Sequence, residues 1–138
     1  MSDPDQKTAE AAGAEMFARD VAVRTLGIAI AEIRPGYARA TLKVRADFLN
    51  GHDICHGGFV FTLADTAFAY ACNSYGRPTV AAAGSIDFLR PVRAGDELTA
   101  IAQERSRSRR SGIYDVSVEN QRNTLIAVFR GRSNEIDK

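Results

Sequence analysis

The sequence lacks the features that would place it among membrane, secreted or nucleic-acid-binding proteins. It has only two cysteines and no apolar run near the roughly 20 residues that span a bilayer. Its first ten residues are polar and unlike a signal peptide. With 18 basic and 17 acidic residues the net charge is +1, so no overall field attracts nucleic acid or an anionic membrane. We therefore expect a reduced, cytoplasmic protein that binds neither.

The length and hydrophobic content favour one globular unit. The 138 residues are 45% hydrophobic and 25% charged, which is the balance of one soluble domain with a sizeable core. We expect a polar N-terminal arm over residues 1–7 and a single domain over residues 8–138.

The spacing of apolar residues predicts a helix, two strands, a second helix and four strands. Thr8 is the candidate N-cap of the first helix. A sheet with one apolar face needs a buried partner, and the second helix is apolar on most sides. We therefore predict an α+β fold in which a curved antiparallel sheet wraps around a long central helix. The predicted ranges are helix 8–24, strands 26–34 and 37–44, helix 57–74, and strands 79–90, 96–107, 111–120 and 124–133.

The predicted central helix carries one carboxylate, Asp65. The polar residues Thr62, Asp65, Thr66 and Asn73 form one narrow stripe along it. In one interpretation the stripe simply faces water, as most helix carboxylates do. In the other, Asp65 lines a cleft, because the residues around the stripe are too apolar for a surface helix. A carboxylate in a cleft can attack an acyl carbon or take a proton from an attacking water.

Gly57 and Gly58 stand where the central helix begins. Glycines there expose backbone N–H groups, and the helix dipole favours a developing negative oxygen beside them. The alternative is steric, because two glycines also allow close packing or a tight turn. Gly57 and Asp65 are eight residues apart, roughly 12 Å along a helix, which is too far for both to serve one carbonyl. Antiparallel pairing of two central helices would join Gly57 of one copy to Asp65 of the other, so we predict an obligate dimer with shared sites.

The loop before the central helix contains both histidines. His52 and His56 have the spacing of a helical zinc signature, but Asn-Gly and Gly-Gly pairs exclude a helix there and no third histidine exists. We therefore predict no metal. His56 is expected to hydrogen-bond this loop or the substrate. Asn50 either donates its amide to a carbonyl or shapes the Asn-Gly turn. Cys55 is expected to be structural, because adjacent residues in an extended loop point apart.

Two groups of arginines are candidates for binding phosphate groups. Each is also compatible with an ordinary charged turn. They are Arg90 and Arg93 after one predicted strand, and Arg105, Arg107, Arg109 and Arg110 at the end of another.

Several motifs occur together in one order: N-G-H-x-x-x-H-G-G, then L-A-D-T-A-F-A-Y-A-C-N-S, I-D-F-L-R-P and A-G-D-E-L-T-A. With these motifs, over about residues 26–132, the chain resembles the hotdog-fold acyl-CoA thioesterases of the phenylacetate-degradation (PaaI) type. The resemblance implies a helix held in a curved antiparallel sheet, dimers that often pair into tetramers, and no cofactor. It also implies coenzyme A thioesters as substrates, with phenylacetyl- or hydroxyphenylacetyl-CoA among them.

By matching motif, the resemblance makes Asp65 the nucleophile or general base and Gly57 the backbone donor to the thioester oxygen. Asn50 and His56 become supporting contacts. Some relatives place a Ser or Thr on the strand after the helix, where this chain has alanines at 81–83. Direct attack and attack through water therefore both stay open. Substrate contacts are expected at Gly58, Thr66 and Phe68, and contacts with the coenzyme A phosphates at Arg90 and Arg107.

Two other functions are compatible with the same cleft. One is a non-catalytic binder of acyl-CoA or of an acyl carrier. The other is a dehydratase of the same fold, which removes water from a hydroxyacyl thioester with a histidine and a carboxylate. The position of Asp65 well inside the helix favours hydrolysis, and the release of free thiol distinguishes hydrolysis from both alternatives.

Overall fold

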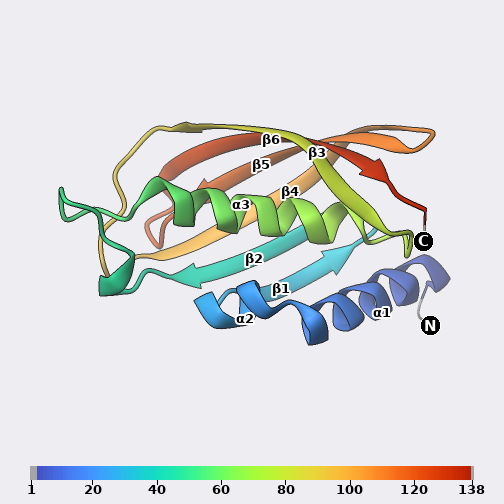
Figure 1. Cartoon of the computed structure of the whole chain (residues 1–138), viewed down its shortest axis with the longest axis horizontal. Helices are drawn as coiled ribbons and strands as arrows, with labels where there is room; N and C mark the ends of the chain where they lie inside the picture. The colour runs from blue at the N-terminus through green and yellow to red at the C-terminus, as the bar shows by residue number, and fades with distance from the viewer. Residues whose placement is uncertain (1–2, 138) are drawn as a thin grey trace.

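Six antiparallel strands form one sheet that curves around helix α3 (Figure 1). The computed structural model describes residues 3–137, and the strand order across the sheet is β1-β2-β4-β5-β6-β3. The predicted order of elements around the central helix is confirmed. No helix in the described residues is long and apolar enough to cross a membrane. The elements are α1 (Pro4–Arg19), α2 (Val21–Leu26), β1 (Ala29–Arg34), β2 (Tyr37–Lys43), the 3-10 turn η1 (Ala46–Phe48), α3 (Gly57–Cys72), β3 (Thr79–Phe88), β4 (Glu97–Ser108), β5 (Ser111–Glu119) and β6 (Leu125–Glu135).

The N-terminal helix differs from the prediction in its bounds. α1 begins at Pro4 and not at Thr8, because the Asp3 side chain accepts the Asp5 N–H at 3.0 Å and so caps the helix. A break at Asp20 then separates α1 from the short helix α2, and the Asp20 carboxylate caps α2 by accepting a backbone N–H. The expected polar arm is therefore helical from Pro4 onward, and its first two residues lie outside the described residues.

Small residues on the sheet let α3 pack closely. Four alanines on β2 and β4, namely Ala38, Ala40, Ala100 and Ala102, are each fully buried. We refer to them as the alanine floor. The helix buries nine of its 16 residues in the same core. Packing at this density holds α3 rigidly against the sheet, so groups along the helix keep fixed distances from one another.

The two edge strands of the sheet differ in their cover. α1 lies along β1 (Figure 1), and the Gln6 side chain of α1 donates to the Ile33 carbonyl of β1 at 2.8 Å. β3 has no comparable cover among residues 3–137, and its residues 80–85 are all exposed. An edge strand with free backbone groups is a template for pairing with another strand. β3 is therefore the open edge of this sheet.

Gly131→Ala is expected to destabilise the fold. A Cβ at Gly131 of β6 would lie 2.7 Å from the Phe68 ring, which is fully buried beside Tyr114 and has no room to move. Overpacking of this kind costs about 1–3 kcal/mol. Gly51→Ala is the control, because a Cβ there meets no atom within 4 Å. Chemical denaturation at one protein concentration should give a lower midpoint than wild type for Gly131→Ala and an unchanged midpoint for Gly51→Ala. Equal midpoints for the two variants would contradict the packing argument.

Candidate active site

Backbone hydrogen bonds fix the loop that precedes α3. The Cys55 N–H donates to the Val92 carbonyl at 2.7 Å. The His56 N–H donates to the Phe48 carbonyl at 2.8 Å. These two bonds tie the loop to the segments on either side and so fix the point at which α3 begins.

Asn50 shapes the turn at the start of this loop. Its side-chain oxygen accepts the N–H groups of His52, at 2.8 Å, and of Ile54, at 3.4 Å. Within residues 3–137 its side-chain NH₂ has no acceptor, and Asn50 is half-buried. The two interpretations of Asn50 are therefore compatible, because the oxygen shapes the turn while the nitrogen is able to donate to a carbonyl.

His56 caps the first turn of α3. Its Nδ1 accepts the Gly58 N–H at 2.9 Å, so the neutral imidazole carries its proton on Nε2. The Gly58 N–H is thereby engaged. The Gly57 N–H, in contrast, has no acceptor in the described part of the chain. Gly57 thus supplies the first-turn amide that is open to an incoming oxygen, and Gly58 contributes through the cap.

A surface pocket of about 500 Å³ opens beside Gly57. Asn50 and Arg90 also line it, so together with Gly57 three of the predicted site residues meet here, and Phe88 lies beside them. The Phe88 ring packs against the helix start, and a Cβ on Gly57 would lie 2.9 Å from that ring. The steric and the chemical interpretations of Gly57 therefore both apply.

Asp65 lies half-buried on α3 and has no hydrogen-bond or ion-pair partner among residues 3–137. Burial raises the pKa of its carboxyl above the ordinary aspartate value. The hydroxyls of Thr62 and Thr66 on the same stripe do not bind it, because they donate to carbonyls one turn back, at 2.8 and 2.7 Å. A half-buried acid without a partner is typical of groups that exchange protons or attack a substrate.

Asp65 and the Gly57 amide are not brought together by one chain. α3 is a single α-helix from Gly57 to Cys72, so the helical rise separates the two groups by about 12 Å. Asp65 also does not line the pocket beside Gly57. The distance argument from the sequence therefore holds for the structure as well.

Two predicted substrate contacts lie in the core. Phe68 is 0% exposed, with its ring centroid 5.6 Å from that of Tyr114 and 5.8 Å from that of Phe129. This placement contradicts direct contact between Phe68 and a substrate, because the sheet covers that side of the helix. Thr66 is 6% exposed, and its hydroxyl is bound within the helix. Thr66 therefore has little surface to offer a ligand.

Arg90 and Arg107 lie at opposite ends of α3. Arg90 lines the pocket at the helix start. Arg107 stacks over Tyr75, beyond the helix end, with its guanidinium carbon 3.6 Å from the ring centroid. One chain therefore does not direct both arginines at the same ligand.

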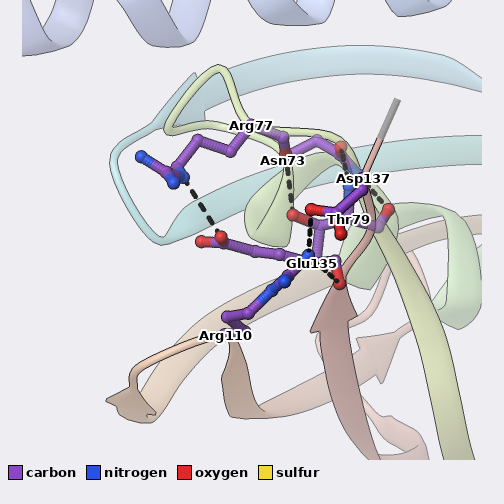
Figure 2. Close-up of polar contacts among 6 residues, drawn as sticks. All are labelled: Asn73, Arg77, Thr79, Arg110, Glu135 and Asp137. Atoms are coloured by element: carbon purple, nitrogen blue, oxygen red, sulfur yellow. Dashed lines mark hydrogen bonds and ion pairs between the residues drawn. The ribbon is translucent and has the colours of Figure 1, made fainter.

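Two neighbours of Arg107 are neutralised by acids. Figure 2 shows Arg77 and Arg110 beside the end of β6, where they pair with Glu135, at 3.1 Å, and with Asp137, at 2.7 Å. Arg107 forms no ion pair within residues 3–137. Arg109 beside it has no ion pair in this range either, so both arginines are open to an external anion.

The far end of α3 is fastened to β3. The side chain of Asn73, the C-cap of α3, exchanges two hydrogen bonds with the Thr79 backbone, at 2.9 and 3.0 Å (Figure 2). The Asn73 side-chain amide thus bonds the Thr79 backbone as a neighbouring strand would, and it links the end of α3 to the start of β3. Both ends of α3 are held in place.

The cysteine and histidine side chains form neither a metal cluster nor a nucleophile. In residues 3–137 no three His, Cys, Asp or Glu side chains gather as ligands. Cys55 is buried, and burial raises the pKa of its thiol to about 11, so it stays protonated at neutral pH. This environment favours a structural role for Cys55.

Sequence reasoning missed the aromatic packing at the start of α3. Phe48 and Phe59 stack with ring centroids 4.3 Å apart, and Phe59 meets His56 edge to face at 6.3 Å. Phe48 precedes the loop and Phe59 follows it. Their contact depends on how the loop folds back, and no spacing rule gives that path.

Known proteins match this geometry over most of the chain. Residues 52–127 match the family model of the thioesterase superfamily. The Escherichia coli acyl-coenzyme A thioesterase PaaI is 51% identical over 121 residues, which cover 88% of this chain and 86% of that protein. The solved E. coli PaaI protein from the phenylacetic acid degradation operon matches with a TM-score of 0.94 and 48% identity, over 96% of both chains.

A more distant structure has a ligand. A hypothetical thioesterase from Streptococcus pneumoniae, solved with coenzyme A, matches with a TM-score of 0.82 and 26% identity, over 90% of this chain and 97% of that one. The family model spans most of the loop, α3, the strands β3 to β5 and the start of β6, where the sequence motifs lie. The resemblance drawn from those motifs is confirmed, and with it the enzyme class. The chain therefore belongs to the thioesterase superfamily, as a hotdog-fold acyl-CoA thioesterase of the PaaI type.

Proposed function

We propose that the chain hydrolyses aryl-acetyl or similar acyl-CoA thioesters at a site that two copies share. The observation that carries this proposal is the open Gly57 N–H at the start of a 16-residue helix. Such an amide, assisted by the helix dipole, stabilises the negative oxygen that develops when a thioester carbonyl is attacked. Asp65 of the partner subunit supplies the carboxylate.

The open edge at β3 supports the pairing of two copies. If β3 pairs antiparallel with a second β3 around a two-fold axis, the two α3 helices lie antiparallel beside each other. The start of one helix then approaches the middle of the other, which brings Gly57 to Asp65 of the partner subunit. The same contact would bury the apolar edge residues Val80 and Phe88, which are 45% and 54% exposed.

The proposed reaction has two routes to the same products. In the first, an Asp65 oxygen attacks the acyl carbon, the C–S bond breaks, and water then hydrolyses the acyl-aspartyl anhydride. In the second, Asp65 takes a proton from water as that water attacks, and the proton passes to the departing sulfur. Each route consumes one water and yields a carboxylic acid and free coenzyme A. The raised pKa of Asp65 suits either role.

Asn50 and His56 support the Gly57 amide in this proposal. The Asn50 NH₂ donates a second hydrogen bond to the thioester oxygen. His56 keeps the Gly58 N–H engaged through the cap. A dehydratase would need this histidine as a base, but its Nδ1 is already an acceptor, so the structure supports hydrolysis better.

Two relatives support the substrate class. The E. coli relative is named an acyl-coenzyme A thioesterase and comes from a phenylacetic acid degradation operon, and the pneumococcal one was solved with coenzyme A. With the start of one helix opposite the middle of the other, the helix end near Arg107 of one chain extends past the helix start of the other, towards the pocket that Arg90 lines. We assign these two arginines to the coenzyme A phosphates.

A depression on the outer face of the sheet supports a pair of dimers. It has a volume of about 570 Å³, and its lining includes the apolar residues Ile101 and Val128. Asp115 and Arg130, which also line it, form an ion pair at 2.6 Å. Apolar surface with polar groups around it is common at contacts between subunits. We propose this face as the contact between two dimers.

Replacing Gly57 by proline should show how much the Gly57 N–H contributes to catalysis. Proline has no N–H, it is tolerated at the first helical position, and His56 at φ −59° and ψ 133° already has the backbone that precedes proline. Gly57→Ala is the control, because it adds the same steric contact with Phe88 and keeps the N–H. Thiol release should have a kcat about 10²–10³-fold lower for proline than for alanine. Equal rates would remove the amide from the mechanism.

Mixing two inactive variants should restore activity. Asp65→Asn lacks the carboxylate and Gly57→Pro lacks the amide, so each homodimer has two defective sites. A dimer with one chain of each kind has one intact site, because the wild-type halves meet across the two-fold axis. Random co-refolding should therefore recover about a quarter of wild-type thiol release. Asp5→Asn, an exposed change on α1, should keep full activity. No recovery from mixed dimers that have been isolated would exclude a shared site.

The rate should depend on the ionisation of Asp65. Only the carboxylate form attacks or accepts a proton, so activity is lost as the pH falls through its pKa. Because burial raises that pKa, the acidic limb of kcat/KM should lie above the ordinary aspartate value of about 3.9. Circular dichroism over the same range would show that the enzyme stays folded. A limb at or below the ordinary value would contradict the assignment.

A further inference from the structure

Four side chains form a stack that ends at the His56 cap. The Arg45 guanidinium lies 4.5 Å from the Phe48 ring centroid, and Phe48 stacks on Phe59 at 4.3 Å with 15° between the ring planes. Phe59 in turn meets the His56 ring nearly at a right angle, at 6.3 Å. Arg45 is itself paired with Asp47 at 3.0 Å. The stack therefore runs from a surface ion pair to the first turn of α3.

The cap depends on the orientation of one exposed ring. Nδ1 of His56 accepts the Gly58 N–H only while the imidazole keeps one orientation and its proton stays on Nε2. The outer torsion of histidine is broad, and water competes for an exposed imidazole. Phe59 flanks this ring in the edge-to-face geometry that aromatic pairs prefer. Among residues 3–137, Phe59 is the aromatic side chain that pairs with the imidazole.

The cap also determines which backbone N–H of the first turn is free to donate into the pocket. With the Gly58 N–H engaged, the Gly57 N–H is the open donor of the first turn. We propose that Phe59, backed by Phe48, is a positioning residue for the thioesterase reaction, which holds His56 in the cap and so keeps the Gly57 amide directed at the substrate. This inference rests on the proposed function of Gly57. Gly58 belongs to the same arrangement, since a Cβ there would lie 3.1 Å from Nδ1 of His56.

Phe59→Leu tests this role, because it keeps an apolar side chain and removes the ring. We expect kcat for thiol release to fall on the order of tenfold, with KM nearly unchanged, since a small misplacement of the amide affects the transition state most. Phe59→Tyr keeps the ring and should retain the rate. Phe129→Leu is the control for lost aromatic packing, because Phe129 pairs with Phe61 and Phe68 in the core. It should lower stability and leave kcat within twofold of wild type.

A double-mutant cycle separates positioning from general packing. Asparagine is a good N-cap without a ring, so His56→Asn keeps an acceptor that Phe59 does not orient. In this background Phe59→Leu should change kcat no further. An equal fall in kcat in both backgrounds would overturn the proposal.

The cap can also be followed without turnover. Imidazole ¹⁵N chemical shifts should show His56 as the Nε2–H tautomer, and the Gly58 amide should exchange slowly with solvent. Phe59→Leu should populate the second tautomer and speed that exchange about tenfold, whereas Phe129→Leu should alter neither. Unchanged His56 signals in Phe59→Leu would overturn the positioning role. If the signals change as expected while Gly57→Pro keeps full activity, the cap assignment is supported and the proposed role of the amide fails.

Discussion

The packing of α3 on the alanine floor is the constraint on which the rest of the structure depends. Because these side chains are so small, the helix lies close to β2 and β4 and has most of its surface covered. This explains two properties of Asp65. The surrounding apolar atoms keep water from part of the carboxyl and so raise its pKa, and no side chain among residues 3–137 pairs with it. Within the described residues the acid is therefore not neutralised, which fits the chemistry proposed for it.

The rigidity of α3 also keeps its two chemical groups, the Gly57 amide and the Asp65 carboxylate, apart. The first turn offers an amide to the pocket, and the carboxylate lies two turns further along. A flexible chain is able to fold back and join them, but an α-helix held by His56 at its start and by Asn73 at its end is not. In the proposed dimer, pairing at the open edge of β3 lets a second copy supply the missing group. The rigidity of α3 is therefore the reason why the proposed site needs two copies.

Periodicity and spacing predicted the order of elements, the central helix and the separation of Gly57 from Asp65, because these depend only on local geometry. The break at Asp20 was not predictable in the same way, since a capping aspartate interrupts the helix without changing the apolar pattern around it. The assignment of Phe68 to the substrate failed because an apolar residue on a mostly buried helix gives no sign of which side the sheet covers. The stack of Phe48 on Phe59 depends on the path of a loop, which sequence patterns do not give.

The composition of β3 has a consequence for the single chain. The exposed part of this edge includes Ala81-Ala82-Ala83-Gly84, with an irregularity in the ladder between Ala81 and Ala83. Alanine and glycine have low β-propensity, and a bulge twists the strand locally. Fibril-forming segments, in contrast, are rich in strong β-formers and stack as regular, identical strands. In the single chain this exposed edge is therefore a poor seed for amyloid-like aggregation.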